Sequence, residues 1–493
     1  MVAEPIHVAS GALPAQSAGK PVRKRLSFVL TLLFIYVGAI TLLGKGPTYI
    51  GFSPIYWGEI VMSLSLVWAL RRWGQVRIPD GGTRVLIALV CCFLMLGFLE
   101  LAMQNGVNMG TTIDALRDSA VSYYALFFFV GMVLASDANR FATFASRWKW
   151  CWLLAVPWKA LNAVTGNTVS NFGLRTQSGI PILSGSGEVT LSLGLGCLLV
   201  LTDSELPRGF TASLRVACLM IGLAVFAGTG GRGVRLAIIA AFFVGILASL
   251  RQPGHGKTFR RLLSLLLLAM AGLAIALALG VDVVGAAHLD RFEAIANSDE
   301  SGDESIDQAA GTATWRSDWW KSLTDEVLSR NPLFGLGFGD PLTEYNPRLA
   351  AGADATLRAP HNYNVTVFAR MGILGALVWS GILYLGIFRQ VWKVVTAKTP
   401  QELSRARQLT FWVGCLVAIW VNASFDVQME GPVAAIPFWL ILGIVARGAR
   451  RSSFPGRLVY ISAPSPASSP ETTVRPTSGG SLPHTASVQT GLP

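Results

Sequence analysis

The stretch TLRAPHNYNVTVFARMGILGAL, residues 356–377, lies where a long polar segment meets an apolar run that continues to about residue 388. His361 and Asn362 lie at that boundary, directly after Pro360. The chain has four other histidines, in polar arms, in a basic loop and just after an apolar run. Because an imidazole titrates near neutral pH, this stretch combines a titratable group, a water boundary and the start of a helix. We expect the rest of the chain to be organised around it.

The composition is that of a polytopic membrane protein. Of the 493 residues, 52% are hydrophobic and 14% are charged, whereas soluble domains carry about 25% charged residues. The net charge of +12 falls in short loops between apolar spans, as the positive-inside rule requires, and does not indicate nucleic-acid binding. The six cysteines lie in or beside apolar runs, so we expect no disulfide framework.

The apolar runs predict an all-α membrane bundle of about twelve transmembrane helices, because a span needs about 20 mostly apolar residues. The expected spans are 26–43, 52–70, 84–103, 120–136, 148–165, 181–201, 213–228, 233–250, 262–284, 365–388, 409–425 and 432–447. One large outer loop separates the ninth span from the tenth. Basic residues precede the first span without a cleavage site, which predicts a signal anchor.

Lysine and arginine concentrate in alternate loops and after the last span, which predicts that both termini are cytoplasmic. The large loop then lies outside, in the periplasm if the cell is Gram-negative. The predicted divisions are a disordered arm over 1–25, spans over 26–284, an outer loop with short helices over 285–364, spans over 365–447 and a disordered tail over 448–493.

Three arginines fall at the outer side of the predicted bundle. Arg175 lies in NFGLRTQSGIP, and Arg232 and Arg235 lie in GTGGRGVRLA, between the seventh and eighth spans. A guanidinium at membrane depth is costly unless paired and is a functional candidate, and its planar fork suits a diphosphate. The alternative is that Arg232 or Arg235 extends to the lipid headgroups. Glu188 follows a flexible SGSG run and either pairs with an arginine or marks a helix end.

The outer loop contains an acidic run, residues 298–307, which we interpret as a solvated flexible segment because its oxygen spacing does not match a calcium loop. TATWRSDWWKSLTDEVL then predicts a helix that ends at Asn331-Pro332. Its apolar face carries Trp315, Trp319, Leu323 and Val327. Arg316 lies beside this face, and tryptophans here either pack at the membrane interface or stack on sugar rings. NPLFGLGFGDP predicts a tight turn that returns the loop to the membrane.

Four motifs, in order, are similar to those of the O-antigen ligase/polymerase superfamily of bacterial membrane glycosyltransferases. Arg175 precedes a Gly/Ser-rich span, and GTGGRGVRLAIIAAFFVGIL resembles the family's S-R-G-x-x-x-A helix start, with Thr-Gly-Gly in place of the usual serine-containing approach. WRSDWWKSLTDEVLSRNPLFGLGFG and PHNYNVTVFARMGILGAL resemble the arginine–tryptophan segment and the His-Asn helix start. The resemblance covers roughly residues 170–447.

The resemblance implies a glycan donor on undecaprenyl diphosphate and transfer with inversion, without a metal or cofactor. The acceptor would be lipid A–core for a ligase, or another lipid-linked repeat for a polymerase. Mapped onto this chain, His361 deprotonates the acceptor hydroxyl. The diphosphate would be held by Arg175, Arg232, Arg235 and Arg316, with Asn362 and Glu188 in support.

The residues themselves agree with this chemistry. Arginines in a low-dielectric site stabilise a leaving diphosphate, and a histidine is a suitable base near neutral pH. A transporter of lipid-linked glycans remains an alternative, although the sequence shows no internal repeat of the kind many transporters have. A non-catalytic scaffold would leave the outer arginines and His361 without a role, unless His361 is only a polar residue at a helix start.

Overall fold

The computed structural model describes residues 26–448 with gaps, as one compact unit within 22–452. The gaps are 53–54, 105–108, 166–172, 178, 180, 184–186, 203–211, 229–231, 251–303 apart from Ser264, and 347–357. The predicted terminal arms, the ninth span and the first half of the acidic run therefore lie outside the described residues.

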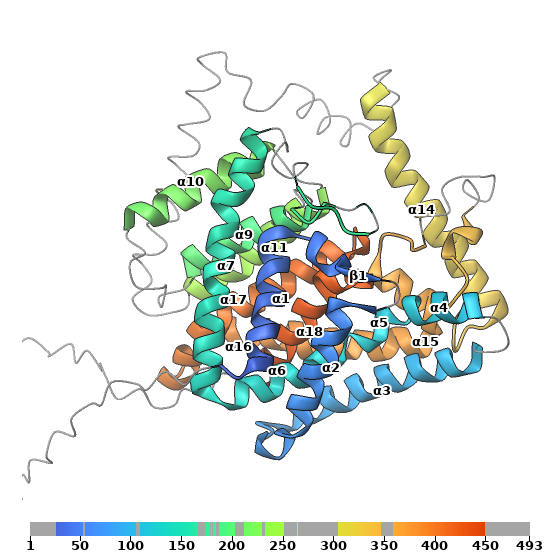
Figure 1. The fold of residues 1–493 in the computed structure, drawn as a ribbon, viewed down its shortest axis with the longest axis horizontal. Coiled ribbons are helices and arrows are strands. Elements are labelled where there is room, and N and C mark those ends of the chain that lie inside the picture. The colour runs from blue at the N-terminus through green and yellow to red at the C-terminus, as the bar shows by residue number, and fades with distance from the viewer. Residues whose placement is uncertain are drawn as a thin grey trace, which may run out of the picture. The chain divides into compact units, whose positions relative to one another are not determined.

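The described chain is helical apart from one short hairpin (Figure 1). The helices before the large gap are α1 (Phe28–Leu43), α2 (Trp57–Leu70), α3 (Gly81–Gln104), α4 (Met109–Asp118), α5 (Ala120–Tyr123), α6 (Leu126–Ser136), α7 (Ala138–Val164), α9 (Gly187–Thr202), α10 (Ala212–Gly228) and α11 (Arg232–Leu250). After it come α14 (Glu304–Arg330), α15 (Tyr363–Leu383), α16 (Arg389–Val395), α17 (Pro400–Ala423) and α18 (Pro432–Arg447).

Short elements connect the helices. The π-helical turn η4 (Tyr384–Phe388) joins α15 to α16, and the 3-10 turn η5 (Val427–Glu430) joins α17 to α18. Strands β1 (Gly51–Phe52) and β2 (Ile55–Tyr56) pair antiparallel, with Gly51 opposite Tyr56. The remaining 3-10 turns are η1 (Gly46–Tyr49), η2 (Trp73–Gln75) and η3 (Leu342–Tyr345).

The apolar helices confirm a multi-pass membrane protein in its coarse features. Segments 81–103, 112–136, 233–250 and 363–395 are long and apolar enough to cross a membrane, and α1, α2, α18 and most of α9 are shorter apolar helices. All expected spans except the ninth coincide with a described helix, the fourth with α5 and α6 together. The twelve-span layout itself stays a prediction, because the ninth span is not described.

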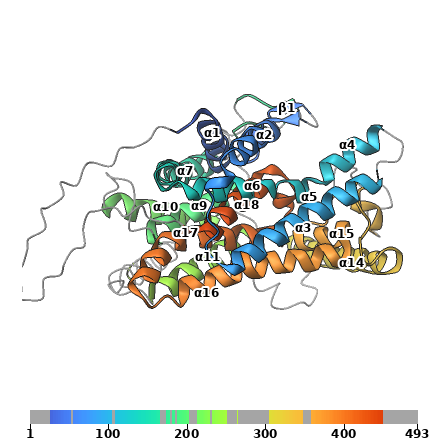
Figure 2. The same ribbon diagram turned by 90° about the horizontal axis from the view of Figure 1, so that it is seen from below.

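The core of the bundle is built around α18. Its side chains Ile436, Phe438 and Trp439 are fully buried, and the helix lies between α6 and α17 (Figure 2). Gly131 of α6 faces the backbone at Leu440, and Gly443 of α18 faces the backbone of α6. Any larger side chain at these positions would meet backbone atoms, so the glycines allow the close helix approach that membrane bundles use.

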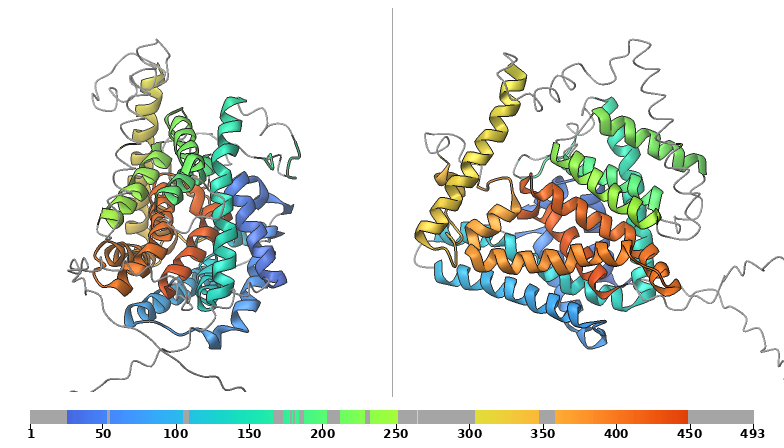
Figure 3. Two further views of the ribbon diagram at one scale, coloured as in Figure 1. Left: turned by 90° about the vertical axis from the view of Figure 1, so that its left-hand side faces the viewer. Right: turned by 180° about the vertical axis from the view of Figure 1, so that it is seen from behind.

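The predicted helix of the outer loop is confirmed as α14, which ends at Arg330 as expected but begins at Glu304, inside the acidic run. Its predicted apolar face is confirmed as well. Trp319, Leu323 and Val327 are fully buried with Leu342 and Ala369, and Trp315 packs at the edge of this cluster. Figure 3 shows α14 in yellow against α15 and its connecting loop in orange. The cluster fixes α14 on the first turns of α15.

The glycine-rich turn after α14 docks onto a break in α15. At Gly372 the backbone has φ 60° and ψ −159°, a conformation that is essentially restricted to glycine. The amides of Leu336 and Gly337 donate to the carbonyls of Ala369 and Arg370, at 2.7 and 3.1 Å. In return the amides of Ile373 and Leu374 donate to carbonyls of the turn, at 2.8 and 3.2 Å. The turn therefore replaces the hydrogen bonds that the broken helix loses.

Candidate functional site

His361 occupies a strained backbone position immediately before α15. Its φ of 55° is the only positive value among the described non-glycine residues, and such strain clusters at functional sites. The next residue, Asn362, is the N-cap of α15, and its side-chain oxygen accepts from the amides of Asn364 and Val365 at 3.0 and 3.3 Å. Asn362 therefore fixes the end of the helix that carries the imidazole, which is 20% exposed.

The turn between α17 and α18 supplies the group that faces the imidazole. Asp426 Oδ1 lies 4.0 Å from His361 Nδ1. The same carboxylate accepts from the amide of Val427 at 2.8 Å and from Gln428 Nε2 at 3.0 Å, so its position is fixed from its own turn. A carboxylate that faces Nδ1 of an imidazole orients the ring, and Nε2 can then contact a substrate.

Arg316 of α14 contacts the same turn. Its Nη1 donates to the carbonyl oxygen of Phe425 at 3.1 Å. Burial lowers the pKa of His361 from its ordinary value, the nearby charge of Arg316 lowers the pKa further, and Asp426 partly opposes both effects. The imidazole is therefore mostly neutral near pH 7, which is the form that can accept a proton.

The N-terminus of α11 packs against this turn as well. A methyl group added at Gly233 would lie 2.8 Å from Cβ of Phe425 and 3.6 Å from Oδ1 of Asn422. Arg232 is the first residue of α11, although its side chain lies outside the described residues, and Arg235 is partly buried less than one turn further on. The positive end of a helix dipole attracts anions, so this backbone position suits a diphosphate.

The two other predicted residues are not joined to this group by any described contact. Arg175 is exposed, and its Nη1 donates to the carbonyl of Gly179 at 2.9 Å within its own loop. Glu188 is the second residue of α9, and its side chain lies outside the described residues. The structure therefore brings His361 and Arg316 together, with the start of α11 against the same turn.

Polar side chains of α15 attach it to the turn 424–430. Asn364 Nδ2 donates to Ser424 Oγ at 3.0 Å, and Thr366 Oγ1 donates to Glu430 at 2.5 Å. Burial raises the pKa of Glu430 to about 8, against the opposing effects of Thr366 and Arg370. Because these bonds fix the turn to the helix that begins beside His361, the spacing between the imidazole and Asp426 is defined by side chains of both elements.

A second polar cluster holds the loop that precedes His361. Asp118 accepts from Arg358 Nε at 3.1 Å and Nη2 at 2.9 Å, and from Arg370 Nη2 at 2.8 Å. The amide of Gly339 donates to the same carboxylate at 3.2 Å. One buried carboxylate thus binds arginines on both sides of His361 in the chain. Asp118, Arg358 and Arg370 were not among the predicted site residues, because two of them lie within or beside apolar runs.

Asp426 was also missed by the sequence prediction, although one signal for it exists. The segment SFDVQMEG, residues 424–431, interrupts two apolar helices with two carboxylates on the predicted outer side. The described residues contain no group of three or more His, Cys, Asp or Glu side chains that could hold a metal ion. Near this turn the described residues offer the guanidinium of Arg316 and the N-terminus of α11.

The fold and the site define a class: a multi-pass membrane protein in which a histidine at a helix start faces an aspartate in a turn between two helices, with an arginine bound to the same turn. Residues 216–380 match the family model described as O-antigen ligase. The chain thus carries an O-antigen ligase family domain, which indicates a glycan-transferring enzyme that uses lipid-linked glycans. The match includes His361, Arg232, Arg235 and Arg316, and excludes Arg175 and Asp426. No curated relative matches the chain.

Proposed function

We propose that this protein is an inverting, metal-independent glycosyltransferase of the O-antigen ligase type. It would move a glycan from undecaprenyl diphosphate to an acceptor sugar hydroxyl at the outer face of the bacterial inner membrane, in surface polysaccharide biosynthesis. Both termini would be cytoplasmic. The observation that carries the proposal is that His361 lies 4.0 Å from Asp426, in the turn whose Phe425 carbonyl accepts a hydrogen bond from Arg316.

In the proposed reaction His361 Nε2 accepts the proton of the acceptor hydroxyl. The hydroxyl oxygen forms a bond to the anomeric carbon of the donor sugar while the bond from that carbon to the diphosphate oxygen breaks. The proton remains on the imidazole, where Asp426, facing Nδ1, stabilises the cation. The undecaprenyl diphosphate leaves with the bonding electron pair. The lowered pKa of His361 keeps the base neutral before the reaction.

The leaving diphosphate gains negative charge in the transition state, and cationic groups placed around it lower the barrier. We assign this role first to Arg316, which binds the carbonyl of Phe425 in the turn that faces His361. We assign it also to Arg232 and Arg235 at the start of α11. Arg175 would reach the diphosphate from its own loop, with Glu188 in support. The start of α11 and α14 both meet the turn 424–430, which supports a shared diphosphate position.

The test uses purified protein in liposomes with one undecaprenyl-diphosphate-linked repeat, with and without lipid A–core. Capping of lipid A–core identifies a ligase, and a ladder of repeats formed without lipid A–core identifies a polymerase on the same scaffold. His361→Ala is expected to lower transfer by about a hundredfold or more, as for loss of a general base. His7→Ala, in the N-terminal arm, is the matched control and should retain activity.

Two outcomes would contradict parts of the proposal. Full activity in His361→Ala would remove His361 from the mechanism. Unchanged use of the donor in Arg232→Ala would remove Arg232 from the diphosphate site. Where Arg232→Ala is impaired, Arg232→Lys should restore activity only in part, because an ammonium lacks the planar fork of a guanidinium.

A further inference from the structure

The segment WRSDWW in α14 contains three tryptophans, and two of them have their indole N–H groups bound inside the protein. Trp319 Nε1 donates to the carbonyl of Leu342 at 2.9 Å, and Trp320 Nε1 donates to the carbonyl of Pro360 at 2.7 Å. A buried tryptophan usually finds such a partner. These two side chains hold α14 to η3 and to the residue before His361, which is a structural role.

Trp315 differs from its neighbours. No described group accepts a hydrogen bond from its indole N–H, and its nitrogen is not among the buried polar atoms that lack a partner. The residue is partly buried at the edge of the cluster around Trp319, with 5.3 Å between the two ring centroids. Trp315 therefore has a fixed apolar side and a polar edge that the described protein does not use.

The ring of Trp315 lies beside the proposed base. Its centroid is 6.4 Å from the centroid of the His361 imidazole, at an interplanar angle of 57°. A molecule in van der Waals contact with the indole, about 4 Å from its plane, would therefore place its edge near the imidazole. The next residue after Trp315 is Arg316, which binds the carbonyl of Phe425. The indole thus lies beside the proposed base in space and directly precedes the proposed diphosphate ligand in the chain.

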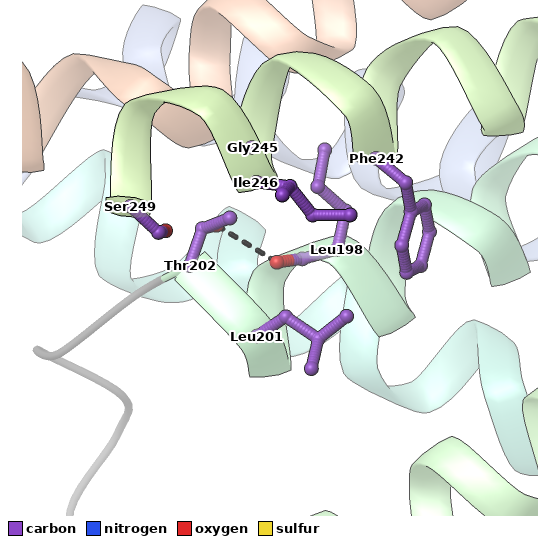
Figure 4. Close-up of a pocket in the computed structure, with 7 residues that line it drawn as sticks. All are labelled: Leu198, Leu201, Thr202, Phe242, Gly245, Ile246 and Ser249. Carbon is purple, nitrogen blue, oxygen red and sulfur yellow. Dashed lines mark hydrogen bonds between the residues drawn. The ribbon is translucent and has the colours of Figure 1, made fainter. Parts of the chain in front are cut away.

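Building on the proposed function, we propose that Trp315 is the stacking platform for the acceptor sugar. The C–H groups of a pyranose face carry partial positive charge and pack on the negative face of an aromatic ring, while the free indole N–H can donate to a sugar hydroxyl. We assign the acceptor rather than the donor because the hydroxyl that loses its proton must reach His361. The apolar cavity in Figure 4, between α9 and α11, lies toward the opposite end of α11 from Arg232 and has no part in this site.

The competing explanation is that Trp315 packs against lipid at the membrane interface, where tryptophan is common. The two explanations predict different effects for different substitutions. Leucine would preserve apolar packing but has no aromatic face, whereas phenylalanine would preserve the face but has no N–H. Trp392 of α16, which is 69% exposed, offers the matched control for loss of a surface tryptophan away from His361.

The experiment measures initial transfer rates in liposomes while lipid A–core is varied at saturating donor, and then while donor is varied at saturating lipid A–core. Trp315→Leu is expected to raise KM for lipid A–core about tenfold, which corresponds to the upper range of an aromatic contact, about 1.4 kcal/mol. KM for the donor should change little. Trp315→Phe should recover most of the loss, and Trp392→Leu should resemble the unmodified protein.

An unchanged KM for lipid A–core in Trp315→Leu would overturn the inference, as would an equal loss in Trp315→Leu and Trp392→Leu. A rise confined to KM for the donor would also overturn it. If the unmodified protein makes only a ladder of repeats, the same series is run with the lipid-linked repeat as acceptor. Absence of any transfer by the unmodified protein would instead contradict the proposed function, so the two failures are distinguishable.

Discussion

His361 is held in place by its backbone and tuned by two charges of opposite sign. Its positive φ is stabilised by the Asn362 cap on one side and by Trp320, which binds the carbonyl of Pro360, on the other. Burial lowers the pKa of the imidazole, Arg316 lowers it further and Asp426 raises it. The position of the ring is therefore set by local hydrogen bonds, whereas its proton affinity is set by burial and by charges far away in the chain.

Replacing these two charges should move the pH dependence of transfer in opposite directions. Asp426→Asn removes the charge that raises the pKa of His361, so the pKa falls and the acid limb of kcat/KM moves to lower pH. Asparagine can still cap η5, which preserves the turn. Arg316→Gln removes a charge that lowers the same pKa, so the acid limb moves to higher pH. The measurement is kcat/KM for the acceptor between about pH 5 and pH 8, the range in which a histidine titrates.

Shifts of the acid limb in the same direction for both variants would contradict the assignment of His361 as the titrating base. Ser317→Ala serves as the control for Arg316→Gln, because Ser317 is exposed on the same helix. Its pH profile should match that of the unmodified protein. The direction of the two shifts separates an electrostatic effect from a general loss of folding, since misfolding would lower the amount of active enzyme without moving the limb.

At this scale the sequence indicated His361 as a candidate base but did not indicate the carboxylate that faces it. His361 could be predicted because few histidines occur and one lies at a polar–apolar boundary. Asp426 lies 65 positions later in the chain, and only the packing of η5 on α15 places it beside the imidazole. The four arginines of the expected diphosphate site were predicted as one group, yet the hydrogen bond of Arg175 is within its own loop. Long-range contacts of this kind leave no periodicity in the sequence.

At the scale of elements, α15 is a broken helix whose break is filled by the turn after α14. Gly372 is essential to this arrangement, because its φ and ψ are accessible only to glycine and a methyl group there would meet the carbonyl of Leu333. The hydrophobic pattern predicted one continuous span over 365–388. It could not predict the break, since the lost helical hydrogen bonds are replaced by a segment more than 30 positions away.

Gly372→Ala should therefore destabilise the protein and impair transfer. The backbone conformation alone costs about 1–3 kcal/mol for a non-glycine residue, and displacement of the turn adds to this cost. Gly81→Ala is the matched control, because a methyl group at Gly81 meets nothing within 4 Å. The midpoint of thermal unfolding in detergent should fall for Gly372→Ala and stay near the unmodified value for Gly81→Ala. Equal midpoints would show that the break is not required.

The carboxylate of Asp118 fixes the loop and the helix on either side of His361. Its loss should therefore lower the free energy of unfolding more than the loss of a nearby surface charge does. Asp118 is 7% exposed and binds two arginines, whereas Asp114 is 44% exposed and lies 3.5 Å from Arg358. Removing one partner of a buried ion pair costs about 3–5 kcal/mol, and an exposed pair contributes about 0–1 kcal/mol.

Asp118→Asn is thus expected to lower both the unfolding midpoint and kcat, while Asp114→Asn leaves both nearly unchanged. The measurements are thermal unfolding in detergent and transfer at saturating substrates. Similar losses in the two variants would show that Asp118 has no special role in holding the loop. A normal unfolding midpoint with a reduced kcat in Asp118→Asn would assign its role to positioning His361 through Arg358 rather than to folding.

For the whole molecule, the hydrophobic pattern predicted the helical bundle because apolar runs about 20 residues long have few other stable arrangements in a membrane. Each of those runs apart from 262–284 coincides with a described helix. What the pattern could not predict is which helices meet at the site. The starts of α11 and α15, the helix α14 and the turn before α18 converge there, although they span 199 positions from Arg232 to Glu430. The convergence follows from the packing of these elements on the turn 424–430.

The proposed orientation places the His361 site at the outer face of the membrane and the basic loops in the cytoplasm. The negative potential of the inner leaflet and the insertion machinery keep Lys and Arg on the cytoplasmic side. Two single cysteines test it, in a background with the six native cysteines replaced by alanine or serine. Ser317→Cys lies on an exposed position of α14, and Lys398→Cys lies on an exposed position between α16 and α17.

A membrane-impermeant thiol reagent applied to cells with a permeabilised outer membrane should label the cysteine at 317 and not the one at 398. After the inner membrane is also permeabilised, both should react. Labelling of the cysteine at 398 alone in the first condition would reverse the orientation and place His361 on the cytoplasmic side, where a glycan donor exposed at the outer face could not reach it.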